Sequence, residues 1–123
     1  MANITLGDRL AACASLVRRG AFLCDVGTDH AYLPIYLCER GVISRAVASD
    51  INEGPLLRAK ENIAAHRLAD KIDTALTGGL HSLEERGFSD IVIAGMGGLM
   101  IRDIISEAPF LRDEEISLVR IQM

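Results

Sequence analysis

The sequence predicts an α/β fold in which a parallel sheet carries helices on both of its faces. Two observations support this prediction. Short apolar runs alternate with helical segments along the 123 residues, and Gly-rich turns follow the apolar runs. Strands that are apolar on both faces are typical of parallel sheets covered by helices on each side.

The first part of the chain alternates helix, strand and helix. An amphipathic helix follows Thr5-Leu6-Gly7-Asp8, which has the form of a capping box. The apolar run 21–26 predicts the first buried strand. Pro34 suits the first turn of the next helix and Gly41 suits its end, so we expect a helix over 33–40.

The same unit then repeats. The run 45–50 predicts the second strand, and Asn52 and Pro55 open a helix behind it. Residues 71–76 predict the third strand. The apolar face expected for the helix consists of Leu56, Ala59, Ile63 and Ala64.

Two further strands complete the pattern. A short helical turn is expected over 80–85, and the run 90–94 predicts the fourth strand. The next helix closes before Pro109, and 117–123 begins a fifth strand. The apolar residues expected to face the core from that helix are Leu99, Ile101, Ile104 and Ile105. We expect residues 1–123 to form one partial domain that ends within the fifth strand.

Composition excludes several classes of protein. Half of the residues are hydrophobic and 24% are charged, which excludes intrinsic disorder. No apolar run approaches the ~18 residues of a membrane span, so we expect no membrane contact. A net charge of −4 gives no bulk attraction to nucleic acid. Cys13, Cys24 and Cys38 form no C-x-x-C pair, so we expect no metal site, reduced thiols and a cytoplasmic location.

The loop after the first strand carries the strongest signal. Ligands of open parallel sheets bind at the carboxyl ends of the strands. A dinucleotide loop needs G-x-G-x-x-G, but this loop has one glycine, Gly27, and two carboxylates, Asp25 and Asp29. These carboxylates would repel a pyrophosphate and suit the sulfonium and ammonium of S-adenosylmethionine. Asp29 alternatively only caps the following helix.

A second acidic residue supports this interpretation. Asp50 ends the second strand, 23 positions after Gly27, where a carboxylate can accept hydrogen bonds from a ribose diol. Its alternative role is a helix cap or a solvated strand end. Thr28 and Ile51 flank these acids, and we include both in the expected cofactor site.

Glycines follow the third and fourth strands. Gly78 and Gly79 let the backbone approach the adenine, unless they only form a tight turn. Ala94 is followed by Gly95-Met96-Gly97-Gly98, whose three glycines are costly in conformational entropy. This loop would face the reacting methyl group. A sharp turn between strand and helix is the alternative.

The other polar candidates are three histidines, a tyrosine and an arginine pair. His30 and Tyr32 border the expected pocket, although a histidine there is more often structural than catalytic. His66 and His81 lie in polar surroundings, and we expect both to be solvated. Arg18-Arg19 is expected to be a surface pair, with an RNA phosphate contact as the sharper option.

Two stretches resemble a known family. The stretches 25–34 and 91–98, DVGTDHAYLP and IVIAGMGG, are similar to signature motifs of the bacterial tRNA (adenine(22)-N1)-methyltransferases. The resemblance implies a Rossmann-like class I methyltransferase fold, S-adenosylmethionine as methyl donor and tRNA as substrate. Members of this family have further strands and a C-terminal helical domain after the matching region. The resemblance therefore implies that residues 1–123 lack both parts.

The resemblance also assigns roles by motif. Asp25, Gly27 and Asp29 would line the methionine end, and Asp50 would hold the ribose. The residues implied beside the adenine and the reacting groups are Gly78, Gly79, Ala94, Gly95 and Met96. Those assigned to catalysis are Asp29, His30 and Met96, and those assigned to the substrate are Tyr32, Gly97 and Gly98. The family tends to have Asn or Asp where this chain has Gly78 or Gly79.

Three rival functions stay open from the sequence. One is an NAD-dependent oxidoreductase, which the missing G-x-G-x-x-G and the acidic loop disfavour. Another is a methyltransferase-like binding module without activity. The last is a methyltransferase with another acceptor, because only the resemblance points to tRNA. We expect a monomer.

Overall fold

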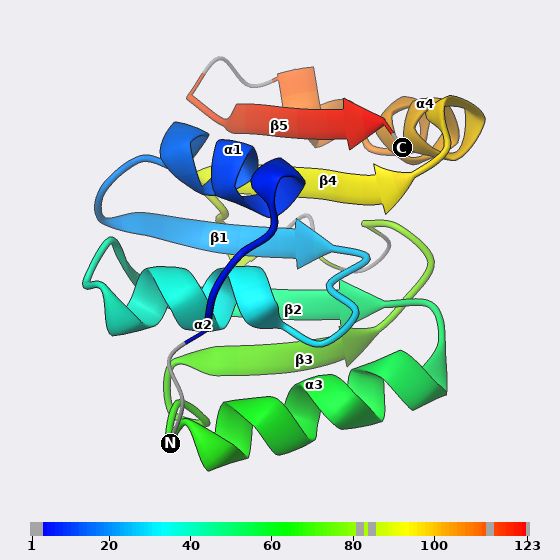
Figure 1. The fold of residues 1–123 in the computed structure, drawn as a ribbon. Coiled ribbons are helices and arrows are strands. Elements are labelled where there is room, and N and C mark those ends of the chain that lie inside the picture. Colours follow the sequence, from blue (N-terminus) through cyan, green and yellow to red (C-terminus); the bar gives the residue numbers. More distant parts are fainter. Residues whose placement is uncertain (1–3, 81–82, 84–85, 113–114, 123) are drawn as a thin grey trace.

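A computed structural model describes residues 4–80, 83, 86–112 and 115–122. Its strands form a parallel sheet in the order β3-β2-β1-β4-β5 (Figure 1). The strands are β1 Ala21–Val26, β2 Ile43–Asp50, β3 Ile72–Leu76, β4 Asp90–Met96 and β5 Ser117–Gln122. The helices are α1 Asp8–Leu16, α2 Tyr32–Glu39, α3 Glu53–Ala65, α4 Gly98–Ser106 and the 3-10 helix η2 Pro109–Arg112.

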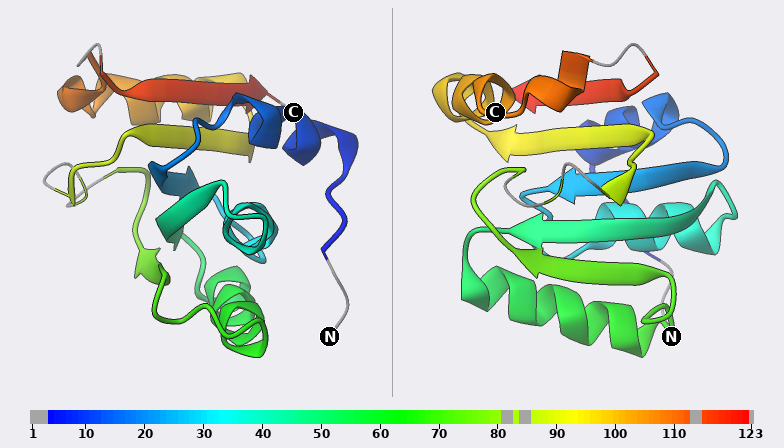
Figure 2. Two further views of the ribbon diagram at one scale, coloured as in Figure 1. Left: turned by 90° about the vertical axis from the view of Figure 1, so that its left-hand side faces the viewer. Right: turned by 180° about the vertical axis from the view of Figure 1, so that it is seen from behind.

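Both faces of the sheet are covered. Helices α1, α2 and α3 lie on one face, and α4 and η2 lie on the other (Figure 2). Successive strand residues feed the two cores in turn: Leu23 and Val92 pack toward the first group of helices, and Cys24 and Ile91 toward the second. This alternation explains why the central strands carry apolar residues on both faces, and it confirms the fold class expected from the sequence.

The strand order creates a switch point in the middle of the sheet. From β1 the chain moves outward to β2 and β3, then crosses to β4 on the other side of β1 and continues to β5. The loops after β1 and β4 therefore diverge from adjacent strand ends. Open α/β sheets bind ligands in the crevice that such divergence leaves.

Near the amino ends of the strands, an ion pair joins a buried aspartate to a half-exposed arginine. Asp90, at the start of β4, is 1% exposed and accepts hydrogen bonds from the backbone N–H of Arg18 at 3.0 Å and from its Nε at 3.1 Å. The Arg18 Nη2 also donates to the carbonyls of Ser89 and Glu115. Arg18 is 51% exposed, as expected for a surface pair at Arg18-Arg19, and its contacts also commit it to the fold.

Several local expectations need correction. Helix α1 begins at Asp8 with Gly7 as its N-cap and no side-chain cap, so the capping box at Thr5 does not form. Ala64 and Leu99 are exposed, because the apolar faces of α3 and α4 are narrower than the sequence suggested. His66 is 11% exposed and its Nδ1 lies 2.9 Å from Glu39 Oε2, so it is not simply solvated.

Some expectations fall outside the described residues. These are the solvation of His81, most of the helical turn over 80–85, and the last residue of the fifth strand. The three cysteines, Cys13, Cys24 and Cys38, are buried free thiols, as expected. Within the described ranges, no helix is long and apolar enough to cross a bilayer.

Candidate functional site

The loop after β1 has a strained backbone. Gly27, Asp29 and Ala31 adopt positive φ angles of 72°, 58° and 63°. Only glycine adopts this left-handed conformation freely, and a non-glycine residue held there costs on the order of 1–3 kcal/mol. Three such residues within five positions mark this loop as a place where the chain accepts strain, which is common at ligand sites.

Asp50 ties three loops together. Its carboxylate oxygens accept hydrogen bonds from the backbone N–H groups of Asp29 at 3.1 Å and Asn52 at 3.0 Å. Its backbone carbonyl accepts a hydrogen bond from the N–H of Thr77 at 2.9 Å. Asn52 is the N-cap of α3, so Asp50 does not have the capping role considered from the sequence. Each carboxylate oxygen keeps a further lone pair for another donor.

Asp25 is a buried carboxyl group at the end of β1. It is 4% exposed, and the hydroxyl of Thr28 donates a hydrogen bond to it at 2.8 Å. Burial raises the pKa of Asp25 from 3.8 to about 7, the Thr28 hydrogen bond opposes this rise, and the nearby charge of Asp50 adds to it. A cation beside Asp25 would favour its charged form.

A mainly apolar pocket of about 220 Å³ opens on one side of Gly27. Gly78 and Gly79 form part of its lining, and side chains there would be crowded: a Cβ would lie 3.3 Å from Ile51 Cδ1 or 3.2 Å from Ile104 Cγ1. Gly79 also has a φ of 89°. The other lining residues are Val26, Thr77, Met96, Met100, Asp103 and Glu107.

A charged pocket of about 220 Å³ opens on the other side of Gly27. It receives Asp25, Thr28 and Asp29 from the strained loop, and Arg9 from α1. Leu10, Leu33 and Ala94 complete its lining. Charges of both signs therefore surround one small cavity, as an amino-acid zwitterion would require.

Met96 lines the apolar pocket beside Gly27, the glycine at which the two pockets meet. A Cβ on Gly27 would collide with Cε of Met96, so a larger residue there would force the end of this flexible side chain to move. The strand β4 continues through an irregularity between Ala94 and Met96 before α4 begins at Gly98. The expected Gly-rich loop after the fourth strand is thus mostly the end of β4 and the start of α4.

His30 and Tyr32 form a stacked pair beside the charged pocket. Their ring centroids lie 5.2 Å apart with an interplanar angle of 15°. His30 Nδ1 lies 3.1 Å from Asp29 Oδ2, and the Tyr32 side chain is 42% exposed. Neither residue lines either pocket, but His30 contacts Asp29, which does, and Tyr32 stacks on His30.

The structure thus brings most of the expected residues together. Nine line the two pockets: Asp25, Gly27, Thr28, Asp29, Ile51, Gly78, Gly79, Ala94 and Met96. Asp50 lines neither pocket, but its hydrogen bonds to Asp29, Asn52 and Thr77 connect the three loops. Gly97 lines neither pocket, and Gly98 instead lines a separate hollow. The surroundings of Gly95 lie outside the described part of the structure.

Sequence reasoning missed the contributions of two helices. Arg9 and Leu10 of α1 line the charged pocket, and Met100 and Asp103 of α4 line the apolar one. Arg9 is an ordinary exposed position of an amphipathic helix. A local sequence pattern does not show which position of a helix packs against the end of a strand elsewhere in the chain.

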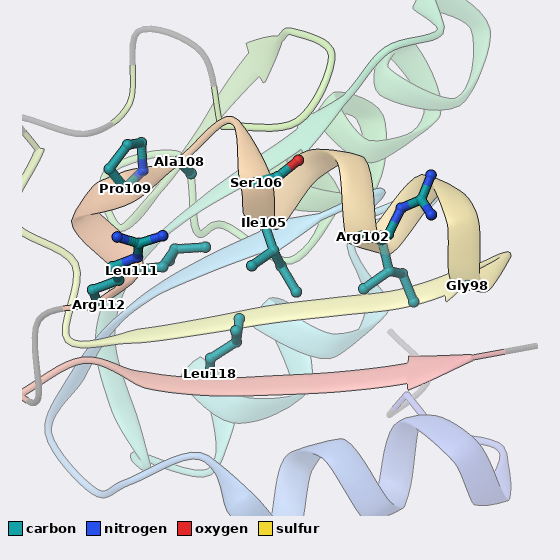
Figure 3. A pocket seen from close by; sticks show the side chains of 10 residues that line it. Gly98, Arg102, Ile105, Ser106, Ala108, Pro109, Leu111, Arg112 and Leu118 are labelled. Carbon is teal, nitrogen blue, oxygen red and sulfur yellow. The ribbon is translucent and has the colours of Figure 1, made fainter.

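A larger hollow lies elsewhere. It measures about 670 Å³ and is bounded by α4, η2 and β5, with Ile105 and Leu118 on its apolar wall and Arg102 and Arg112 at its rim (Figure 3). Among the described residues of the loops after β1, β2 and β3, none lines it. We therefore place the candidate site at the two smaller pockets. Among the residues with described positions, no three metal-ligating side chains gather.

Known proteins share this fold and sequence. Residues 6–120 match the family model described as "Methyltransferase domain". A curated relative is the tRNA (adenine(22)-N(1))-methyltransferase of Bacillus subtilis (strain 168), 36% identical over 105 residues, covering 85% of this chain and 44% of the relative.

Solved structures give the same result. The B. subtilis m1A22 tRNA methyltransferase has a TM-score of 0.89 at 32% identity, over 95% of this chain and 50% of that chain. The M. capricolum protein in complex with S-adenosyl-homocysteine has a TM-score of 0.83 at 33% identity, over 94% of this chain and 51% of that one. The chain spans about half the length of these relatives.

Proposed function

The chain belongs to the methyltransferase-domain family, and from this premise we propose that its carboxyl edge binds S-adenosylmethionine. We propose further that the whole protein methylates N1 of adenine 22 in tRNA, the reaction that the names of its relatives state. One observation carries the first proposal. Two small pockets meet at Gly27: one offers glycines and exposed apolar side chains to a flat base, and the other offers Arg9, Asp25 and Asp29 to a charged amino acid.

The charged pocket fits the methionine end of the ligand. Its carboxylates, Asp25 and Asp29, suit the α-ammonium group, and the guanidinium of Arg9 suits the α-carboxylate. An ammonium beside Asp25 would also favour the ionised form of this buried acid.

The apolar pocket fits the adenosyl end. Gly78 and Gly79 leave room for a flat ring beside Ile51. Asp50 would accept hydrogen bonds from the ribose hydroxyls with the lone pairs that its backbone contacts leave open. In this arrangement Met96 lies where the two ends of the ligand join.

The proposed chemistry needs alignment more than proton transfer. S-adenosylmethionine, when bound, supplies a sulfonium-bound methyl group. Adenine N1 has an in-plane lone pair when the base is neutral, so no residue must first remove a proton. Holding the two reactants in line can contribute ~7–11 kcal/mol. N1 lies on the Watson–Crick edge, so the base must be exposed before it can react.

Three residues are placed to help the acceptor base. The stacked rings of His30 and Tyr32 form a partly exposed aromatic surface on which an adenine can lie. Asp29, beside them, would stabilise the positive charge that develops on the methylated ring. These are proposals about roles, and each can be tested by substitution.

Binding experiments test the cofactor site. S-adenosylhomocysteine and 5′-methylthioadenosine share the adenosyl part, but only the first carries the amino acid. We expect Arg9→Gln to weaken the first ligand about tenfold and to leave the second unchanged, because only the first presents a carboxylate. Arg19→Gln is the matched control, since Arg19 is exposed and lines neither pocket. Equal loss of both ligands would refute the role of Arg9.

Two further measurements separate the rival functions. Calorimetric titration with NAD in place of S-adenosylhomocysteine should show no binding, and the reverse result would favour an oxidoreductase. Transfer of labelled methyl groups to tRNA tests activity, with a tRNA carrying G22 as control. We expect Asp29→Asn to lower turnover. Unchanged turnover and cofactor affinity would remove Asp29 from catalysis, and ligand binding without transfer would indicate a binding module.

We propose that the protein acts in the cytoplasm as a monomer, with residues 1–123 as the cofactor-binding part of a longer enzyme. Three buried free thiols support a reducing compartment. The chain spans about half the length of its relatives, which supports the proposal that it is one part of a longer enzyme. Light scattering of the purified chain tests the oligomeric state.

A further inference from the structure

We propose that Asp103 of α4 recognises the 6-amino group of the cofactor's adenine. This inference rests on the proposed function, because it assumes that the apolar pocket receives the adenosyl part. Asp103 lines that pocket together with Met100, one turn earlier on the same helix.

The lining of this pocket is mainly apolar and includes two carboxylates, and we refer to the pocket as the apolar slot. Gly78 and Gly79 form one wall, Ile51 lies against the first and Ile104 against the second. Ile51 is 60% exposed and Met100 is 52% exposed, so two large apolar side chains remain open to a ligand. Apolar walls with few polar groups are typical of small-molecule sites, where the polar groups set specificity.

An apolar slot alone does not distinguish adenine from other purines. The feature that marks adenine is the exocyclic amino group, which donates hydrogen bonds. The loop after β3 offers glycines where an acidic side chain could have accepted them. An ionised carboxylate accepts only, so the acidic side chains that line this pocket, Asp103 and Glu107, have the chemistry that the loop lacks.

The position of Asp103 favours it for this role. It directly precedes Ile104, whose side chain abuts Gly79, so it lies next to the glycine wall. Asp103 Oδ1 lies 3.5 Å from Arg102 Nη2, and the two side chains are 65% and 71% exposed. Exposed ion pairs add little stability, so replacing the contact to Arg102 by a hydrogen bond from a ligand amino group costs little free energy.

The test compares two ligands that differ at one position. S-inosylhomocysteine carries an oxygen where S-adenosylhomocysteine carries the 6-amino group. We expect the wild-type chain to prefer the adenosyl ligand about tenfold, because a site that accepts from an amino group disfavours an oxygen there. Asp103→Asn should reduce this preference to about threefold or less, since an amide can donate to the oxygen. Both affinities are measured by isothermal titration calorimetry.

The control variant is Arg102→Gln. It removes the same ion pair but lies on the larger hollow rather than on the slot, so the preference for the adenosyl ligand should persist. An unchanged preference in Asp103→Asn, or an equal loss of both ligands, overturns the role of Asp103. Failure of the wild-type chain to bind either ligand instead overturns the proposed function itself.

Discussion

The buried carboxyl of Asp25 makes the stability of the protein depend on pH in a defined direction. Burial raises the pKa of Asp25 from 3.8 to about 7 in the folded state, whereas the unfolded chain keeps the ordinary value. Between these two values the folded state holds a proton that the unfolded state has lost. The free energy of unfolding therefore falls as pH rises from about 4 to about 7, and the loss is constant above that.

The size of this effect follows from the two pKa values. Each pH unit of difference corresponds to about 1.4 kcal/mol, so the interval gives on the order of 4 kcal/mol. Asp25→Asn removes the ionisation and retains an acceptor for the hydroxyl of Thr28, which lies 2.8 Å away. The variant should thus gain about 4 kcal/mol over wild type on going from pH 4 to pH 8.

Urea unfolding at several pH values measures this gain. The useful quantity is the difference between variant and wild type, because all other titrating groups cancel in it. Asp70→Asn serves as control, since Asp70 is exposed and a carboxyl that stays hydrated carries no burial cost. If the difference between Asp25→Asn and wild type is the same at pH 4 and pH 8, the assignment of the raised pKa is refuted.

Three other substitutions give distinct outcomes. Gly27→Ala should cost about 1–2 kcal/mol of stability, because alanine must adopt the left-handed backbone conformation of this position. It should also weaken the binding of S-adenosylhomocysteine at least tenfold, because its Cβ displaces the Met96 side chain where the two pockets meet. An unchanged affinity in calorimetry would contradict this. Asp50→Ala should weaken the same ligand, and an unaltered affinity would remove Asp50 from the site. Arg18→Ala should cost about 3 kcal/mol in urea unfolding, because it leaves Asp90 buried without its cation, and should spare ligand affinity per folded molecule.

The sequence was sufficient for the order and nature of the elements. Runs dominated by apolar residues located the strands, because strands covered on both faces bury most of their side chains. The ends were less certain: β4 continues to Met96, past the Ala94 that ended the predicted run, because Gly95 joins the strand. The family resemblance, found from the loop around Asp29 and the Gly-rich stretch after Ala94, is confirmed by the relatives.

The helices contributed what the sequence could not place. Asp25 and Gly78 belong to loops that the parallel sheet must bring to one edge, so their proximity follows from topology. Arg9 and Asp103 reach that edge from helices on opposite faces, and their positions depend on how each helix packs. His66 shows the same limit, because its partner Glu39 lies 27 residues away at the end of another helix.

Two buried aspartates on adjacent strands show why the carboxyl edge is suited to a cationic ligand. Asp90, at the amino edge, is held by the guanidinium of Arg18, so its charge is matched within the fold. Asp25, at the carboxyl edge, has the neutral hydroxyl of Thr28 as its side-chain donor, and its pKa is raised. A buried carboxylate is stable when a cation faces it. A ligand ammonium in the charged pocket would therefore neutralise the charge of Asp25, as the guanidinium of Arg18 neutralises that of Asp90. Part of the binding free energy would come from removing the cost of a buried, unpaired Asp25 carboxylate.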